Sequence, residues 1–288
     1  MNKLFSACVG ILSLITTVVG AGDRPSTIDE FYDTQARTRV IAHRGFSGAA
    51  PENTLAAVRA AIEIQADMVE IDVTLTVDDH IVVIHDETLD RTTNGGGEVS
   101  DFTLAELQQL DAGGWFAPTF TGERIPTLDA VFDEIEGMIL LNVEIKTEAV
   151  DRGIVTKVAS AIQRRRMIDQ VVVSSFSPTA LQQMHSEAPE IRTAVLYKTK
   201  FHKGQDAVEI VTDLNASAFH IKRQRLTKKM KRRCMESDIP IGIYKVNDPR
   251  RMRRLVKKGI DAIFTDHPDR LLEILKPTPV PVRVPIPG

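Results

Sequence analysis

The sequence predicts an α/β protein of the (β/α)8 TIM-barrel class, with an insertion after the second-strand region. Two observations lead to this prediction. Apolar runs rich in β-branched residues alternate with helical patterns eight times, within the roughly 250 residues that such a barrel usually takes. Charged and imidazole side chains also stand at the ends of several apolar runs, which is where parallel barrels carry their chemistry.

The strands and helices are predicted from apolar periodicity and from the residues that bound each run. The predicted strands are residues 40–43, 68–77, 139–146, 171–176, 192–197, 218–221, 239–246 and 262–265. The predicted helices are residues 54–65, 128–136, 150–166, 178–188, 206–214, 227–237, 249–257 and 268–275. The alternative is a doubly wound open sheet, but no Gly-x-Gly-x-x-Gly follows the first strand, so nothing supports a dinucleotide-binding fold.

The predicted barrel spans residues 40–276. Residues 1–21 combine a basic start, an apolar stretch and small residues, and they predict a signal peptide on an exported, periplasmic or secreted protein. An uncleaved membrane anchor and a buried helix are the alternatives. Residues 22–39 are predicted to be a polar linker, and residues 277–288, with five prolines, an extended tail. Residues 86–127 break the strand–helix rhythm and are expected to form a lid or substrate wall, or else a surface excursion.

Cysteine content and charge distribution limit the possible disulfides and binding partners. Without residues 1–21, Cys234 is the only cysteine, so no intramolecular disulfide is possible. Residues 1–170 carry 27 acidic and 14 basic side chains, whereas residues 171–288 carry 12 and 22. The basic excess, mainly in residues 222–258, is either solvated helix surface or a surface that attracts anionic lipid headgroups or anionic substrate. Aromatic residues are almost absent there, which argues against nucleic-acid binding by stacking.

Two predicted strands carry charged side chains at alternate positions, Glu70 with Asp72 and Glu144 with Lys146. Side chains two residues apart in a strand point to the same face. Burying a charge is costly unless it is paired or bound to metal. A cation held by these carboxylates therefore explains the pattern. The alternative is the solvent-exposed face of an antiparallel strand.

Histidines stand at the ends of two further apolar runs. Residues 40–42 lead into His43 and Arg44, and residues 81–84 lead into His85 and Asp86. Four apolar runs thus carry or end in histidine, arginine, lysine and carboxylate side chains. Their convergence favours a catalytic site. For each histidine, the alternative is a buried structural residue.

Eight short motifs occur in a fixed order along the chain. They are His43-Arg44-Gly45, Pro51-Glu52-Asn53-Thr54, Glu70-Ile71-Asp72, His85-Asp86, Leu89-Asp90-Arg91-Thr92-Thr93, Ile125-Pro126-Thr127-Leu128, Glu144-Ile145-Lys146 and Thr265-Asp266-His267-Pro268. Each is weak alone, but the ordered set, over residues 40–275, strongly resembles the glycerophosphodiester phosphodiesterase family. The resemblance implies a (β/α)8 barrel with an insertion after the second strand. It also implies metal ligands and an acid–base pair, which are Glu70, Asp72 and Glu144, and His43 and His85, respectively.

The expected site binds one divalent cation and a small-molecule phosphodiester. Hard carboxylate oxygens favour Ca²⁺ or Mg²⁺ over zinc. Arg44 and Lys146 are expected to bind the phosphate. Glu52 and Asn53 are expected to bind or position these groups, and Asn53 also to cap the first helix.

The expected substrate pocket includes Phe176 and Tyr244, although either is alternatively a packing residue. The family usually has Trp-Thr-Val-Asn where this chain has Tyr244-Lys245-Val246-Asn247. Tyrosine keeps an aromatic wall and adds a hydroxyl group. We therefore expect a more polar pocket and an altered preference for the leaving group.

The resemblance implies metal-dependent hydrolysis of glycerophosphodiesters to glycerol 3-phosphate and an alcohol such as choline or ethanolamine. The nucleophile is water or the neighbouring glycerol hydroxyl. One alternative is a lysophospholipase D that acts on single-chain lipids and is recruited through the basic helices. Another is a non-catalytic, metal-dependent binding protein of the envelope. The two histidines weigh against it, because a binding protein needs neither acid nor base.

Overall fold

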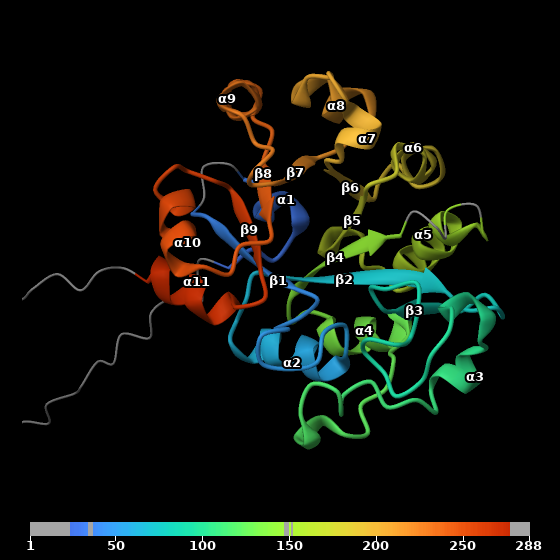
Figure 1. The fold of residues 1–288 in the computed structure, drawn as a ribbon. Helices are drawn as coiled ribbons and strands as arrows, with labels where there is room; N and C mark the ends of the chain where they lie inside the picture. The colour runs from blue at the N-terminus through green and yellow to red at the C-terminus, as the bar shows by residue number, and fades with distance from the viewer. Residues whose placement is uncertain (1–23, 34–36, 147–149, 151, 277–288) are drawn as a thin grey trace, which may run out of the picture.

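Eight parallel strands form a closed barrel in the computed structural model, which describes residues 24–33, 37–146, 150 and 152–276 (Figure 1). The barrel strands, in chain order, are β1 (Arg39–His43), β2 (Met68–Leu75), β4 (Leu140–Ile145), β5 (Val171–Ser175), β6 (Arg192–Leu196), β7 (Ala218–Lys222), β8 (Ile241–Tyr244) and β9 (Ala262–Thr265). Closure follows from β1, which pairs in parallel with both β2 and β9. The predicted barrel is thus confirmed and the open sheet excluded. The predicted signal peptide and proline-rich tail lie outside the described residues.

Helices surround the barrel (Figure 1). They are α2 (Leu55–Glu63), α4 (Leu128–Ile135), α5 (Ile154–Arg164), α6 (Pro178–Glu187), α7 (Thr199–His202), α8 (Ala207–Asp213), α9 (Lys228–Glu236), α10 (Pro249–Val256) and α11 (Pro268–Leu275). Six of them begin after a polar residue whose side chain accepts a backbone N–H of the first turn: Thr54, Thr127, Ser177, Asp206, Thr227 and Asp248. Among the described helices, none has the length and apolar character needed to cross a membrane.

The segment before His85 is a strand, but it is not one of the parallel barrel strands. β3 (Ile81–Val83) folds back on the end of β2 as an antiparallel hairpin partner, with Val83 opposite Val73. The N–H of Ile84 then donates to the carbonyl of Asp72 at 3.0 Å. Because β3 runs back, it places His85 beside the end of β2 at the level of Asp72.

The insertion, residues 86–127, has a small hydrophobic core of its own. It contains a 3-10 helix (Val99–Asp101), α3 (Leu104–Leu107) and a second 3-10 helix (Pro118–Phe120). Leu89, Val99 and Leu107 are buried in one cluster with Val82 and Ile84 of the hairpin. The insertion is therefore packed onto β3, and His85 lies where the two meet.

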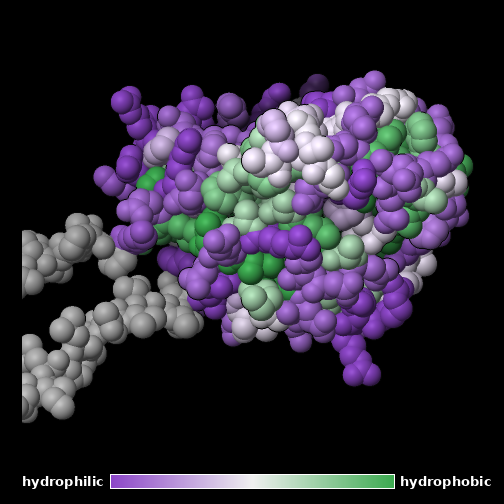
Figure 2. Space-filling view, turned by 90° about the horizontal axis from the view of Figure 1, so that it is seen from below, coloured by the Kyte–Doolittle hydropathy of each residue, from purple (hydrophilic) through white to green (hydrophobic). Residues whose placement is uncertain are grey.

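Hydrophilic residues dominate the face of the molecule that includes α2, α4 and the insertion, and hydrophobic residues gather near its middle (Figure 2). The large hydrophobic side chains exposed among the described residues are Val77, Trp115, Met138 and Met235. Trp115 lies in the insertion, where its ring packs edge-on against Phe116, with centroids 5.7 Å apart. The two rings therefore contact each other, although 41% of Trp115 remains exposed.

The segment expected to be a linker closes the amino-terminal end of the barrel. It contains α1 (Ile28–Phe31), and Ile28 and Phe31 are only 1% and 2% exposed. They pack in one cluster with interior residues from the start of the strands, including Met68 and Leu140. α1 lies at the centre of the ring of strands (Figure 1). The segment is predicted to be a linker because its composition is polar. Its two apolar residues are three positions apart, however, and this spacing fits one face of a helix.

We expect Phe31→Ala to lower the free energy of unfolding by about 3–5 kcal/mol, because it leaves a cavity beneath the barrel. Met138→Ala is the matched control, because Met138 is 56% exposed, and it should change stability by less than about 0.5 kcal/mol. Guanidinium unfolding followed by circular dichroism measures both. Equal stability of the two variants would contradict the role of α1.

Candidate active site

A cavity of about 570 Å³ opens at the carboxyl ends of the barrel strands. Its lining residues come from β1, the insertion and the ends of β4 to β8. They are His43, Arg44, His85, Asp86, Glu87, Glu144, Lys146, Phe176, Lys198, Lys222, Tyr244 and Lys245. Most residues that the sequence singled out thus share one cavity.

Three carboxylates meet at this end of the barrel. Glu70 and Asp72 alternate along β2, and strand pairing sets Glu144 of β4 directly opposite Asp72. One oxygen atom from each of the three residues lies within 4.8 Å of the others. Glu70 and Asp72 are almost fully buried. The group expected to bind metal is therefore gathered in space, as the period of two along β2 predicted.

Two cations partly compensate these carboxylates. Lys146 Nζ lies 2.7 Å from Asp72 Oδ1 and 2.9 Å from Glu144 Oε1, and Arg44 Nε lies 3.3 Å from Asp72 Oδ2. Burial alone would raise the pKa of Asp72, but the charges of Lys146 and Arg44 hold it below its usual value.

Glu70 is less well compensated. Burial and repulsion from Asp72 and Glu144 raise the pKa of Glu70 well above its usual value. Its Oε2 accepts the backbone N–H of Arg44 at 2.9 Å. A divalent cation would supply the missing positive charge, and the all-oxygen donor set fits Ca²⁺ or Mg²⁺. The three carboxylates are thus compatible with a divalent metal site.

Two turns hold Arg44 and Asp72 in place. Arg44 has a positive φ of 58°, and the next residue, Gly45, has a φ of 77°. A Cβ on Gly45 would lie 2.6 Å from Ala57, so this close approach requires glycine. Asn53, also at positive φ, donates from Nδ2 to Asp72 Oδ2 at 2.9 Å and accepts the Asp72 N–H at Oδ1.

The prediction that Asn53 caps the first helix is wrong. Thr54 caps α2, because its side-chain oxygen accepts the N–H of Ala57. The amide group of Asn53 is instead used on Asp72. The sequence does not distinguish which of Asn53 and Thr54 caps the helix, because both asparagine and threonine are common N-cap residues.

His43 and His85 each have an aspartate partner. His43 Nδ1 lies 2.6 Å from Asp266 Oδ1, and His85 Nδ1 lies 2.5 Å from Asp86 Oδ1. In a neutral ring bonded in this way, Nδ1–H donates and Nε2 keeps its lone pair. Burial lowers the pKa of both histidines, and for His43 the bond to Asp266 opposes that effect. The neutral ring is therefore favoured at each position.

Sequence reasoning did not assign a role to Asp266, which follows the last barrel strand. Besides His43, Asp266 accepts from Asn247 Nδ2 at 2.6 Å and lies 2.8 Å from Lys245 Nζ. The only signal was its position in a motif quoted for the resemblance. Its partnership with His43 joins β9 to β1, which are neighbours only because the barrel closes.

Glu52 does not line the cavity but joins two arginines. One oxygen accepts from Arg44 at 2.6 Å, and both accept from Arg91 of the insertion at 2.8 Å. Arg91 in turn donates to both oxygens of Asp86, the partner of His85. The structure therefore places Glu52, expected to touch substrate or position other groups, in a network between Arg44 and His85.

The two predicted pocket residues face the cavity as an aromatic pair. The rings of Phe176 and Tyr244 meet edge to face with centroids 6.0 Å apart. The Tyr244 hydroxyl donates to the carbonyl of Tyr197 at 2.9 Å. The proton of this hydroxyl is thus used by the backbone, so toward a substrate the oxygen can act only as a hydrogen-bond acceptor.

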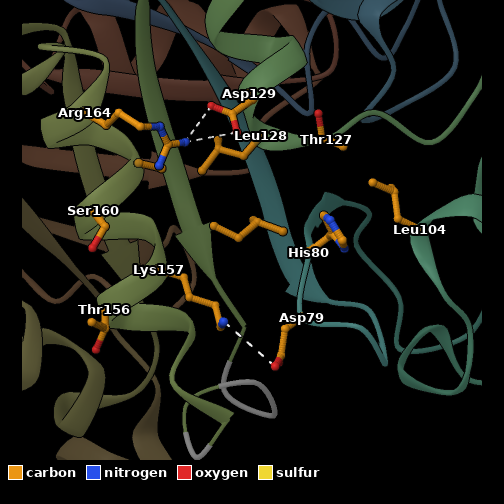
Figure 3. Close-up of a pocket in the computed structure, with 12 residues that line it drawn as sticks. Asp79, His80, Leu104, Thr127, Leu128, Asp129, Thr156, Lys157, Ser160 and Arg164 are labelled. Atoms are coloured by element: carbon orange, nitrogen blue, oxygen red, sulfur yellow. Dashed lines mark hydrogen bonds and ion pairs between the residues drawn. The ribbon is translucent and has the colours of Figure 1, made fainter.

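A second cavity, of about 510 Å³, lies on the outside of the barrel between α4, α5 and the β2–β3 turn. Its charged side chains are paired with one another, Lys157 with Asp79 and Arg164 with Asp129 (Figure 3). None of the predicted site residues lines it. The chemistry is therefore concentrated at the barrel mouth.

The fold and the site together define a barrel whose strand ends carry a carboxylate group, two cations and two histidines, which is where barrel enzymes act. The chain matches the glycerophosphoryl diester phosphodiesterase family over residues 43–270. It is 39% identical over 242 residues to the glycerophosphodiester phosphodiesterase of Caldanaerobacter subterraneus. The aligned region covers 83% of this chain and 98% of that protein. A Bacillus subtilis glycerophosphodiester phosphodiesterase is 30% identical over 296 residues, and the aligned region covers 95% of this chain and 97% of that protein.

Solved structures give the same result. A glycerophosphodiester phosphodiesterase from Agrobacterium tumefaciens superposes with a TM-score of 0.73 at 32% identity, covering 82% of this chain and 99% of that one. An Oleispira antarctica phosphodiesterase in complex with the product sn-glycerol-3-phosphate gives a TM-score of 0.78 at 30% identity, covering 84% and 98%. The chain belongs to the glycerophosphoryl diester phosphodiesterase family.

We expect Glu70→Gln and Glu144→Gln each to weaken Ca²⁺ or Mg²⁺ binding by at least about tenfold, because each removes one charged oxygen ligand. Calorimetric titration of protein stripped with a chelator measures the affinity. Glu63→Gln, an exposed residue at the end of α2, is the matched control. Wild-type affinity in both site variants would show that the carboxylates hold no metal.

Proposed function

We propose that this enzyme hydrolyses glycerophosphodiesters to glycerol 3-phosphate and an alcohol, with a divalent cation held by Glu70, Asp72 and Glu144. The observation that carries the proposal is that three carboxylates, two partly buried cations and two histidine–aspartate pairs lie in or directly beside one cavity. Family membership and the relative that binds sn-glycerol-3-phosphate support the substrate class. Ca²⁺ and Mg²⁺ are the ions that suit these ligands.

Arg44 and Lys146 would bind the phosphate oxygens. Both line the cavity, and their ion pairs with Asp72 hold them at its floor. Burial would lower the pKa of Lys146, but Asp72 and Glu144 raise it, so the ammonium stays charged. When bound, a divalent cation would add Lewis-acid polarisation of the phosphoryl group. Preorganised cations of this kind stabilise charge that develops in the transition state.

His43 and His85 would move the protons. A neutral ring with Nδ1 held by an aspartate can accept a proton at Nε2, and the aspartate stabilises the imidazolium that forms. One histidine would take the proton of the attacking hydroxyl group. The other, in its protonated form, would donate to the departing alkoxide. Asp266 and Asp86 orient the two rings, and the Glu52–Arg91 bridge fixes Asp86.

The cavity favours a water-soluble diester over a single-chain lipid. Its described lining contains two aromatic side chains, Phe176 and Tyr244, and no aliphatic one. An acyl chain needs an apolar channel to replace its contacts with a membrane or micelle. Lysophospholipase D activity therefore has less support. Two histidines with aspartate partners likewise support catalysis over binding alone.

Phosphorus NMR of a panel of glycerophosphodiesters tests the proposal, with chelation followed by addition of Ca²⁺ or Mg²⁺. We expect glycerol 3-phosphate to appear only after metal is added. His43→Ala and His85→Ala should each lower kcat by about 10²–10⁴-fold, the usual contribution of acid–base catalysis.

The control for this experiment is His80→Ala, because the His80 side chain is 53% exposed in the β2–β3 turn. It should retain wild-type turnover. Full activity in His43→Ala or His85→Ala would remove that histidine from the mechanism. Failure to release glycerol 3-phosphate from any diester would refute the proposed reaction.

We also propose that the basic surface between α9 and α10 contacts anionic membranes. Among the residues that the structure describes, six basic side chains and no carboxylate line a groove of about 400 Å³ there: Arg223, Lys228, Lys231, Arg251, Arg254 and Lys258. Each lysine or arginine near an anionic bilayer contributes about 1 kcal/mol. Arg223 of the groove directly follows Lys222, which lines the active-site cavity.

Vesicle co-sedimentation tests this contact. Lys228→Gln combined with Arg254→Gln should weaken binding to phosphatidylglycerol-rich vesicles by about 2 kcal/mol, roughly 30-fold. Lys157→Gln with Arg164→Gln, on α5 across the barrel (Figure 1), should have little effect. Equal binding to phosphatidylcholine vesicles, or equal loss in both double variants, would contradict the proposal.

A further inference from the structure

The active-site cavity has two unlike halves. β1, β2 and β4 supply the carboxylates, His43, Arg44 and Lys146. The segments at the ends of β5 to β8 supply two aromatic side chains and three lysines: Phe176, Tyr244, Lys198, Lys222 and Lys245. The first half accounts for the phosphate and the metal. The second half must face whatever else the substrate carries.

Lys198 is held over the aromatic side of this second half. Its Nζ lies 5.6 Å from the centre of the Phe176 ring and 5.9 Å from that of Phe201. Such contacts with the faces of aromatic rings stabilise a cation without neutralising it. No ion pair joins Lys198 to a residue of the described chain, so its charge remains available to a ligand.

Lys222 and Lys245 lie on the neighbouring strands. Lys222 ends β7 and is paired in register with Tyr244 of β8. It is exposed, and it likewise forms no ion pair with the described part of the chain. Lys245 follows Tyr244, and it pairs with Asp266 while 48% of its side chain remains exposed. Two of the three lysines thus face the cavity without a carboxylate partner.

The acidic residues of the described lining come from β4 and from the start of the insertion. Glu144 is paired with Lys146, and Asp86 with His85 and Arg91. Glu87 follows Asp86 at the start of the insertion. Among the described lining residues, none at the ends of β5 to β8 is acidic. The unpaired charges of Lys198 and Lys222 therefore favour negative charge next to Phe176.

We propose that Lys198 and Lys222 bind an anionic group on the alcohol portion of the substrate, so that the preferred diester carries a second negative charge. The inference rests on the proposed function and specifies its substrate class. Glycerol itself is uncharged, so the extra charge belongs to the alcohol that leaves. A phosphate monoester or a carboxylate on that alcohol fits two lysines.

This proposal changes the expectation that choline or ethanolamine is the leaving alcohol. An aromatic pair could bind a quaternary ammonium group through its ring faces. Here Lys198 already lies over Phe176, and a cationic alcohol would meet like charge from Lys198 and Lys222. Repulsion between like charges at close range therefore disfavours a cationic alcohol at this end of the cavity.

Three diesters test the proposal: glycerophosphoglycerol, the same compound with a phosphate monoester on its second glycerol, and glycerophosphocholine. With the metal that supports turnover, kcat/KM should be highest for the phosphate-bearing diester, by about tenfold over glycerophosphoglycerol, and lowest for glycerophosphocholine. The tenfold ratio should decrease as salt is added, because exposed charges are screened.

Lys198→Gln combined with Lys222→Gln should bring the ratio of the phosphate-bearing to the neutral diester from about ten to about one. Lys200→Gln is the matched control, because Lys200 lies over Phe201 but does not line the cavity, and it should leave the ratio unchanged. Equal kcat/KM for the two glycerol diesters, a preference for glycerophosphocholine, or a ratio unaffected by the double variant would overturn this proposal alone. No hydrolysis of any of the three would instead overturn the proposed function.

Discussion

The burial of Asp72 inside the barrel is the constraint on which the rest of the site depends. This carboxylate is 1% exposed, and an isolated charge in such a place is strongly unfavourable. Lys146, Arg44 and Asn53 each contact it. Removing any one of them would leave a buried charge partly uncompensated. The same contacts hold Lys146 and Arg44 against the cavity, so the side chains that compensate Asp72 are also the ones proposed to bind the phosphate.

The insertion is part of the site through a continuous chain of charged contacts. From His85 the contacts run through Asp86, Arg91 and Glu52 to Arg44. Arg91 is the only one of these that is strongly exposed, at 44%. Because each link is a charge-assisted hydrogen bond, the histidine and the arginine are held in a common geometry. The insertion therefore orients the His85 ring and also forms part of the cavity wall.

The two halves of the cavity are proposed to bind different parts of the substrate. Carboxylates and their counter-ions occupy the β1–β4 side, where the phosphoryl group would react. Lysines and aromatic rings occupy the β5–β8 side, where the leaving alcohol would lie. A barrel allows this division because each strand end contributes independently to one mouth. Substrate preference can then change on one side while the chemistry on the other is retained.

The sequence by itself determined the barrel and its carboxylates. Apolar periodicity predicted eight strands with helices between them, and the spacing of Glu70 and Asp72 put both on one face, because strand side chains alternate with a fixed local period. The histidines at 43 and 85 were likewise singled out by the apolar runs before them. Only the tertiary structure showed that β3 turns back to deliver His85, that α1 closes the barrel, and that Asp266 reaches His43. It also showed that Asn53 holds Asp72 and that Lys198 and Lys222 share the cavity with Phe176. These contacts join residues far apart in the chain, and they depend on strand register, turn geometry and barrel closure, which local periodicity does not encode.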